Sequence, residues 1–323
     1  MATTIEDVAA LAGVGVGSVS RVLNGSTAVS ERMRKAVMDA VEALNYTPNS
    51  MAKRLRKQRS GVIALMVPIV YHPFFSQFID RVAREVEKYG YSVLLIASQQ
   101  HIEKENEIIQ KIKRKEVDGA IFVTHYLHAE EEIRGLPLVS IDRHLSTEIP
   151  CVTSNNYDAT RLALEYLQSK GCKKIGFLGT KPFVESEVSL RKLAYDDFIR
   201  EHQMQEYSVF RAIEHGKEQC LCKEFLQKFP EIDGIFASGY SIAMAVEAMA
   251  KSKGYKIPED MQLIAYDGTF HDFSSASLIT CIEQPIKEMA KQATKLLLDK
   301  IEGKSVPEKV VLQSKLVIGT TTK

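Results

Sequence analysis

Three glycines occupy every second position of the stretch LAGVGVGSVSR, residues 11–21, and glycine-rich loops often cradle phosphate groups. The dinucleotide-binding fingerprint G-x-G-x-x-G needs a glycine at its sixth position. Counted from Gly13 the sixth residue is Ser18, and counted from Gly15 it is Ser20. The preceding IEDVAALA has helical rather than strand periodicity, and no Walker-type lysine follows. The stretch is therefore not predicted to bind a nucleotide.

Other chemistry-bearing residues form no recognisable constellation. The five cysteines are odd in number, and Cys220-Leu-Cys222 lacks the two-residue gap and the second pair of a zinc site. Buried or idle thiols in a reducing cytoplasm are the favoured interpretation for Cys151, Cys172, Cys220, Cys222 and Cys281. Serine, histidine and aspartate are all present, but no nucleophile elbow joins them. We expect this chain to bind no metal or cofactor and to have no catalytic activity.

The glycine stretch instead fits a helix-turn-helix, in which a helix, a tight glycine turn and a second helix meet and the second helix enters the DNA major groove. Small Ala9 and Gly13 let the helices approach, and Val14, Val19 and Val22 are expected to pack. The residues predicted to face DNA are Val16, Gly17, Ser18, Ser20 and Arg21. The fork of Arg21 matches a guanine edge. Its alternative is an ordinary solvated arginine.

Two different periodicities divide the chain. Residues 4–60 show only helical spacing, with a third helix capped by Ser30 and ended by Asn45 in the left-handed conformation. From residue 61, apolar runs of strand length alternate with helical segments. The predicted strands are Val62–Val67, Val93–Ala97, Ala120–Val123, Leu138–Ile141, Ile175–Leu178, Ile235–Ala237 and Leu263–Tyr266. The helices include Phe74–Tyr89, Ile102–Lys115, Asp158–Lys170 and Ser241–Ser252. This alternation predicts parallel sheets covered on both faces, and the length predicts two similar sheet units.

Charge is distributed unevenly along the 323 residues. Residues 1–60 carry nine Lys/Arg against five Asp/Glu, whereas the remainder carries 33 against 36. A basic head on a slightly acidic body favours a polyanionic partner for the head. No apolar run reaches the roughly 20 residues of a membrane helix, and no basic-then-apolar leader is seen. We expect a cytoplasmic protein without a membrane partner.

The run TIEDVAALAGV…VSRVLNG…LNYTPN closely resembles the N-terminus of the lactose/galactose repressor (LacI/GalR) family, and the likeness continues to Tyr266-Asp267-Gly268 and Ile282-Glu-Gln284-Pro285. It implies a small all-α helix-turn-helix head at 1–48, a hinge helix at 49–60 and a two-lobed α/β core at 61–323, similar to periplasmic sugar-binding proteins. The N-lobe would span about 61–154 and 284–314, and the C-lobe about 155–283 and 315–323. The resemblance also implies a homodimer, a pseudo-palindromic double-stranded operator, a small sugar effector, and DNA contacts from Thr4, Asn24 and Ser30.

The hinge is basic around a few apolar residues. The resemblance implies that Leu55 is wedged into a minor-groove step beside Ala52. The base-stacking energy lost at that step is offset by contacts that DNA bending permits. Lys53, Arg54, Arg56 and Lys57 are expected to hold DNA phosphates, and Asn49 is also expected to contact DNA. The alternative is a solvated linker, which in the free protein folds only on DNA.

Effector-binding side chains are sought where strands end, because the ligand of such folds lies at the carboxyl ends of the strands. Arg191, Asp267 and Gln284 match family pocket positions, and His72, Phe74 and Phe75 match the family's Asn-Pro-Phe-Phe with histidine replacing asparagine. Ser98, His125, Asp142 and Arg143 follow predicted strands. Each has a plainer alternative: the phenylalanines as core residues, and the histidines as exposed or hydrogen-bonded ones.

One departure from the family bears on the ligand. Where relatives often have Ser-Asn-Asp, this chain has Ser238-Gly239-Tyr240, which removes two usual hydroxyl partners and leaves Tyr240 as a stacking or hydrogen-bonding candidate. The stretches IPCVTSNN and LIAYDGT look closest to the sucrose-operon branch. We therefore expect a repressor responding to a sucrose-like or fructoside sugar. The alternatives are a sugar-binding protein without DNA function, or a relative controlled by a non-sugar effector or a protein co-repressor.

Overall fold

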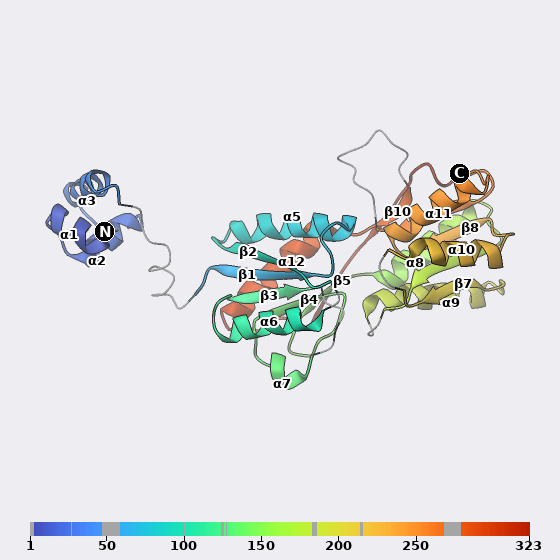
Figure 1. Ribbon diagram of the computed structural model, residues 1–323, viewed down its shortest axis with the longest axis horizontal. Coiled ribbons are helices and arrows are strands. Elements are labelled where there is room, and N and C mark those ends of the chain that lie inside the picture. Colours follow the sequence, from blue (N-terminus) through green and yellow to red (C-terminus); the bar gives the residue numbers. More distant parts are fainter. Residues whose placement is uncertain are drawn as a thin grey trace. The chain divides into compact units, whose positions relative to one another are not determined.

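The computed structural model describes residues 3–26, 28–46, 59–99, 101–123, 126, 128–182, 186–213, 216–267 and 279–323. The chain divides into two compact units, residues 1–60 and 61–323, which are described separately below (Figure 1). The predicted architecture, a small all-α head and a two-lobed α/β core of parallel sheets, is confirmed.

In the described part of the first unit, three helices pack around a small apolar core. They are α1 (Ile5–Ala12), α2 (Val16–Leu23) and α3 (Glu31–Ala43). Each helix contributes one fully buried valine to this core: Val8, Val19 and Val37. Gly13 ends α1 with a φ of 64°, and Asn45 follows α3 with a φ of 46°. Both left-handed positions therefore lie where the sequence predicted helix ends.

The first lobe of the core contains a six-stranded parallel sheet in the order β11-β5-β4-β3-β1-β2. Its strands are β1 (Val62–Val67), β2 (Ser92–Ala97), β3 (Gly119–Phe122), β4 (Leu138–Ile141), β5 (Cys151–Ser154) and β11 (Lys309–Leu312). Helices α5 (Pro73–Glu87) and α12 (Ile286–Ile301) pack together on one face. Helix α6 (Ile102–Lys113) covers the other, and α7 (Glu130–Ile133) is a single short turn.

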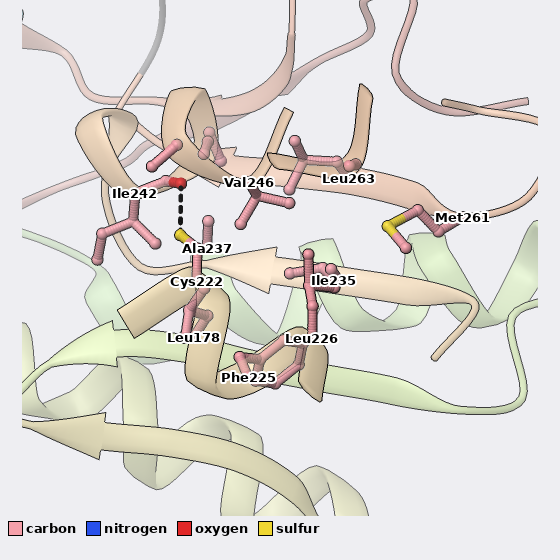
Figure 2. Close-up of a cluster of buried hydrophobic side chains, with 14 of the residues drawn as sticks. Leu178, Cys222, Phe225, Leu226, Ile235, Ala237, Ile242, Val246, Met261 and Leu263 are labelled. Atoms are coloured by element: carbon pink, nitrogen blue, oxygen red, sulfur yellow. Dashed lines mark hydrogen bonds between the residues drawn. The ribbon is translucent and has the colours of Figure 1, made fainter. Parts of the chain in front are cut away.

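The second lobe repeats this plan, in the order β12-β10-β9-β8-β6-β7. Its strands are β6 (Ile175–Thr180), β7 (Tyr207–Arg211), β8 (Gly234–Ala237), β9 (Gln262–Tyr266), β10 (Thr280–Glu283) and β12 (Lys315–Val317), of which β12 alone runs antiparallel to its neighbour in the pairs described. Helices α8 (Asn156–Ser169) and α9 (Leu190–Glu201) cover one face. Helices α10 (Glu218–Lys228) and α11 (Tyr240–Ser252) cover the other, over the cluster of Figure 2, in which the Cys222 thiol lies near the Ile242 carbonyl.

The chain passes between the lobes after β5, after β10 and between β11 and β12. Within each lobe the order 2-1-3-4-5 reverses direction beside the first strand, between β1 and β3 and between β6 and β8. Ligands of such sheets bind at the carboxyl ends of the strands next to this switch point. The topology therefore directs attention to the segments that follow β1, β3, β6 and β8.

No helix in the described ranges is long and apolar enough to cross a membrane.

Candidate DNA-reading head and effector cleft

Helix α2 presents a mixed surface. Val19 and Val22 are buried, and Val16 also packs against the head's apolar cluster. Ser18 and Ser20 are half-buried, while Gly17, Arg21 and Asn24 are exposed. The outward surface on which DNA contacts were predicted therefore consists mainly of small or polar groups, with Arg21 as its cation.

The longer polar side chains of α2 fold back onto their own helix in the free head. Arg21 Nε donates to the Gly17 carbonyl at 3.3 Å, and Asn24 Nδ2 donates to the Ser20 carbonyl at 2.7 Å. Both contacts are exposed and local, so base or phosphate acceptors of DNA can replace them at little cost.

Two predicted DNA contacts serve as helix caps. The Thr4 hydroxyl accepts from the Asp7 amide at 3.3 Å, and the Asp7 carboxylate accepts from the Thr4 amide at 2.8 Å, which completes a capping box at α1. The hydrogen bond from the Thr4 amide lowers the pKa of Asp7 most, and a second one, from the Thr4 hydroxyl to the same carboxylate, lowers it further. Ser30 accepts from the Met33 amide at 3.4 Å and caps α3. A capping hydroxyl keeps a second lone pair, so capping leaves room for a phosphate contact.

The predicted hinge contacts Asn49, Ala52, Lys53, Arg54, Leu55, Arg56 and Lys57 lie outside the described residues, as does the predicted cleft residue His125.

In the core, a cavity of about 470 Å³ lies between the carboxyl ends of the two sheets. Its size falls within the roughly 300–1,000 Å³ of small-molecule sites. Of the predicted cleft residues, those that line it are His72, Phe74, Phe75, Asp142, Arg143, Arg191, Asp267 and Gln284. The structure thus brings together side chains from both lobes that are far apart in the sequence.

Arg191, on the first turn of α9, is the most fixed cation of this cavity. Its side chain is buried, and its guanidinium carbon lies 3.4 Å from the centroid of the Tyr266 ring. Nε donates to Asn156 Oδ1 and Nη1 donates to the Ser238 carbonyl, both at 2.7 Å. A stacked, hydrogen-bonded guanidinium loses little rotamer freedom when it binds a ligand oxygen, so the residue is pre-organised.

Asp142 follows β4 and faces the same cavity. Its φ is 60°, and its Oδ1 accepts from the Thr153 hydroxyl at 2.6 Å. Burial raises the pKa of Asp142, and this outweighs the lowering by the Thr153 hydrogen bond and by the Arg191 charge. Burial likewise lowers the pKa of its neighbour Arg143. Because both side chains are largely buried, their hydrogen bonds to ligand hydroxyl groups form at a lower effective dielectric than in water and are correspondingly stronger.

Asp267 and Gln284 form a short polar chain that reaches a crossing segment. Gln284 Nε2 donates to Asp267 Oδ1 at 2.5 Å, and Gln284 Oε1 accepts from the Ser154 hydroxyl at 2.9 Å. Ser154 Oγ also lies 3.0 Å from the Tyr266 hydroxyl. Because Ser154 ends β5 where the chain leaves the first lobe, this chain joins the cavity to the segments that connect the lobes.

Comparison with known proteins decides the family. Residues 4–49 match the model of bacterial regulatory proteins of the lacI family, and residues 164–322 match that of a periplasmic binding protein-like domain. The ribose operon repressor of Halalkalibacterium halodurans is 36% identical over 99% of this chain and 97% of its own length. The chain belongs to the LacI family. It is a DNA-binding transcriptional regulator.

A second relative and a solved structure are also similar to this chain. The sucrose operon repressor of Streptococcus mutans is 31% identical over 99% of each chain. The relatives of this chain therefore include a sucrose operon repressor as well as a ribose operon repressor. In the structure of the lac repressor dimer bound to operator and the anti-inducer ONPF, the fold is the same, with a TM-score of 0.84 at 22% identity and coverage of 100% of this chain and 99% of that one.

The aromatic group of this LacI-family cleft has one member that belongs mainly to the core. Phe74 is 5% exposed and stacks on Phe78, whereas Phe75 is half-buried and lies edge-on to Phe74. His72 caps α5, its Nδ1 accepting from the Phe74 amide at 3.3 Å. Because Nδ1 accepts here, the neutral ring carries its proton on Nε2.

Two predicted cleft residues lie away from the cavity. Ser98 is fully buried, and its neighbour Gln99, with a φ of 52°, lines the cavity instead. Tyr240 begins α11 and packs against the apolar cluster of the second lobe, whereas Gly239 and Ser241 on either side line the cavity. The turn geometry after each strand decides which of two neighbouring side chains points inward.

Sequence reasoning also missed several lining residues. Thr180 ends β6 and Lys181 follows it, so the strand-end rule that selected Asp142 would have found them had it been applied there. Ile213 and Glu218 lie between β7 and the first turn of α10, and neither element was predicted. Val188, before α9, had no sequence signal.

Proposed function

We propose that this chain represses a sugar-utilisation operon and that a small sugar bound in the cleft changes its affinity for the operator. The observation that carries the proposal is the pairing of a LacI-family head with a cavity in which Arg191, Asp142 and Asp267 converge. Hydroxyl groups of a sugar both donate and accept, and they match carboxylates and a guanidinium held within one small cavity.

The charges of the cavity favour a neutral ligand. Its lining includes three basic residues, Arg143, Lys181 and Arg191, and three acidic ones, Asp142, Glu218 and Asp267. A phosphorylated sugar would bring negative charge that no surplus cation of the lining offsets, whereas a neutral polyol meets donors and acceptors in balance. The apolar ring of Phe75 is available to the carbon face of the sugar.

D-Ribose and sucrose are the first ligands to test. Relatives of this chain are named ribose and sucrose operon repressors, at 36% and 31% identity. A cavity of about 470 Å³ has room for either sugar. A fructoside was the expectation from the sequence, and the ribose relative adds a pentose on equal terms.

We further propose that two copies read a pseudo-palindromic operator, since a two-fold symmetric protein requires two-fold symmetric half-sites. Helix α2 would read the major groove through Arg21, Ser18 and Ser20. Residues 49–60 would form the hinge, with Leu55 in the minor groove. An operon regulator acts where the chromosome is, so we place the chain in the cytoplasm, and we assign it no catalytic activity.

Deleting residues 1–60 tests this division of labour. The shortened chain should lose operator binding and keep sugar binding, measured by fluorescence anisotropy with duplex DNA and by calorimetry with D-ribose and sucrose. An intact chain that binds sugar but no duplex DNA would favour the rival function, a sugar-binding protein without DNA function. Turnover of a bound sugar would overturn the non-enzyme assignment.

A further inference from the structure

The segment before α9 reaches from the second lobe to the first. It contains the short 3-10 helix η1 (Glu187–Ser189), which runs directly into the helix that carries Arg191. The Glu187 amide donates to the Asp142 carbonyl at 3.0 Å. A backbone hydrogen bond therefore joins the lobes beside two residues that line the cavity.

The Glu187 side chain adds two charged contacts with the first lobe. Its Oε1 accepts from Lys309 Nζ at 2.7 Å and lies 2.9 Å from His144 Nε2. Lys309 begins β11, and His144 follows β4. The Glu187 side chain is only 11% exposed, so water screens this cluster less than it screens a surface ion pair.

This cluster differs from two side-chain hydrogen bonds that lie at the crossing segments. Ser154 with Gln284 and Asn155 with Gln313 involve the segments through which the chain itself crosses, so they persist whether the cleft is open or closed. Glu187 lies between β6 and α9, which both belong to the second lobe, so the backbone does not pass from one lobe to the other near this residue. Its contacts with the first lobe therefore depend on the lobes being closed.

The carboxylate of Glu187 is ionised at neutral pH. Burial acts to raise the pKa of Glu187, but the hydrogen bonds from Lys309 and His144, together with the charges of these two groups, outweigh burial and hold the pKa below its ordinary value. The contacts with Lys309 and His144 are consequently charge-assisted under ordinary conditions.

We propose that Glu187 is a latch: by joining Asp142, His144 and Lys309 of the first lobe, it holds the cleft closed and positions Val188 and Arg191 against the effector. The latch rests on the proposed function, because it deepens the account of the same cleft. Glu187 does not line the cavity, so it acts as a positioning residue through the segment that follows it.

The expected effect follows from population shift. When only a fraction of molecules is closed, the apparent affinity falls by that fraction. If removing the latch charge leaves roughly a tenth of molecules closed, sugar binding weakens about tenfold. The test uses Glu187→Gln, which keeps the shape of the side chain. The matched control is Glu224→Gln, because Glu224 pairs with Arg211 at 2.9 Å entirely within the second lobe.

A distance between the lobes provides a readout that needs no sugar. Cys220, on α10, is exposed, and the other four cysteines are buried, so it takes one spin label. Glu87→Cys at the exposed end of α5 takes the other. Pulsed electron paramagnetic resonance on the full chain then compares the latch variant with the control, with and without D-ribose or sucrose. Calorimetry on the same full-length variants measures affinity.

The latch predicts a longer-distance population in E187Q alone, reversed by bound sugar, with affinity about tenfold weaker than in E224Q. Glu187→Asp, which keeps the charge, should recover part of both effects. Label distances in E187Q that match those in the unmodified chain and in E224Q would overturn the latch. If the unmodified chain binds neither sugar, the choice of effector is overturned, and the sugar-free label distances still decide for or against the latch.

Discussion

Replacing Gly17 with alanine should stabilise helix α2 without altering its packing. Helix α2 is built from poor helix formers: two glycines at its start, three β-branched valines and two serines in ten residues, 15–24. Gly15 stands at the N-cap and provides no side-chain hydrogen bond, and the first turn has no acidic residue. The helix is therefore held mainly by the burial of Val19 and Val22.

The magnitude follows from the surroundings of Gly17. A Cβ added there meets no atom within 4 Å, so the methyl group adds neither strain nor burial. What remains is the difference in helix propensity between glycine and alanine, about 1 kcal/mol. If α2 opens locally, this is about a fivefold decrease in the opening constant.

Hydrogen–deuterium exchange of the full chain measures this opening, followed by mass spectrometry on peptides covering residues 13–26. G17A should slow exchange of the α2 amides about fivefold and leave the core unchanged. The matched control is Gly13→Ala, which also meets no neighbour but has a φ of 64°. Alanine in that conformation costs about 1–2 kcal/mol, so exchange should accelerate. Unchanged or faster exchange in G17A would refute the view that α2 is limited by its own propensity.

Three further predictions concern readout and the cleft. Arg21→Ala should weaken operator binding by about 1–3 kcal/mol and relax base choice at one position per half-site, measured by anisotropy on a set of operator variants; equal weakening on every sequence would make Arg21 a backbone contact. Selection from random duplexes should show weak preference at the pairs facing Val16 and Gly17, and strong choice there, lost on changing only those two residues, would contradict it. Asp142→Asn should raise the melting temperature at pH 7, because the raised pKa of Asp142 means that its charged form costs stability. The gain should vanish as the pH falls below the ordinary carboxyl pKa of 3.8, and sugar binding should weaken throughout; a lower melting temperature at pH 7 would refute the sign.

The strands that the sequence predicted best are those buried on both faces. Val62–Val67 and Leu138–Ile141 agree with β1 and β4 to the residue, because a short, mainly apolar run that begins after glycine or proline and ends at proline or a polar residue is typical of a buried strand. Strands β5, β7, β10, β11 and β12 were not predicted. They are short and mix polar with apolar residues without a regular period, as in the TCIE of Thr280–Glu283, so they give no distinct signal.

The sequence located the cleft, but at some strand ends it selected a residue one position away from the one that lines the cavity. Arg191, Asp267 and Gln284 were named from the family resemblance, and all three line the cavity. The strand-end rule chose Ser98 over Gln99 because it cannot predict that a residue without special sequence features adopts a positive φ. Glu187 escaped for another reason: its partners lie 43 and 122 positions away along the chain, and no local pattern records them.

The central claim is that one chain couples a sugar in the cleft to DNA at the head. The most direct test is the affinity of the full-length protein for a duplex selected by it from a random pool, measured at fixed salt with and without saturating D-ribose or sucrose. We predict a pseudo-palindromic duplex and an affinity that one of these sugars changes by about 5–150-fold. A selected duplex whose binding neither sugar alters would contradict the account, and so would the absence of any selected duplex.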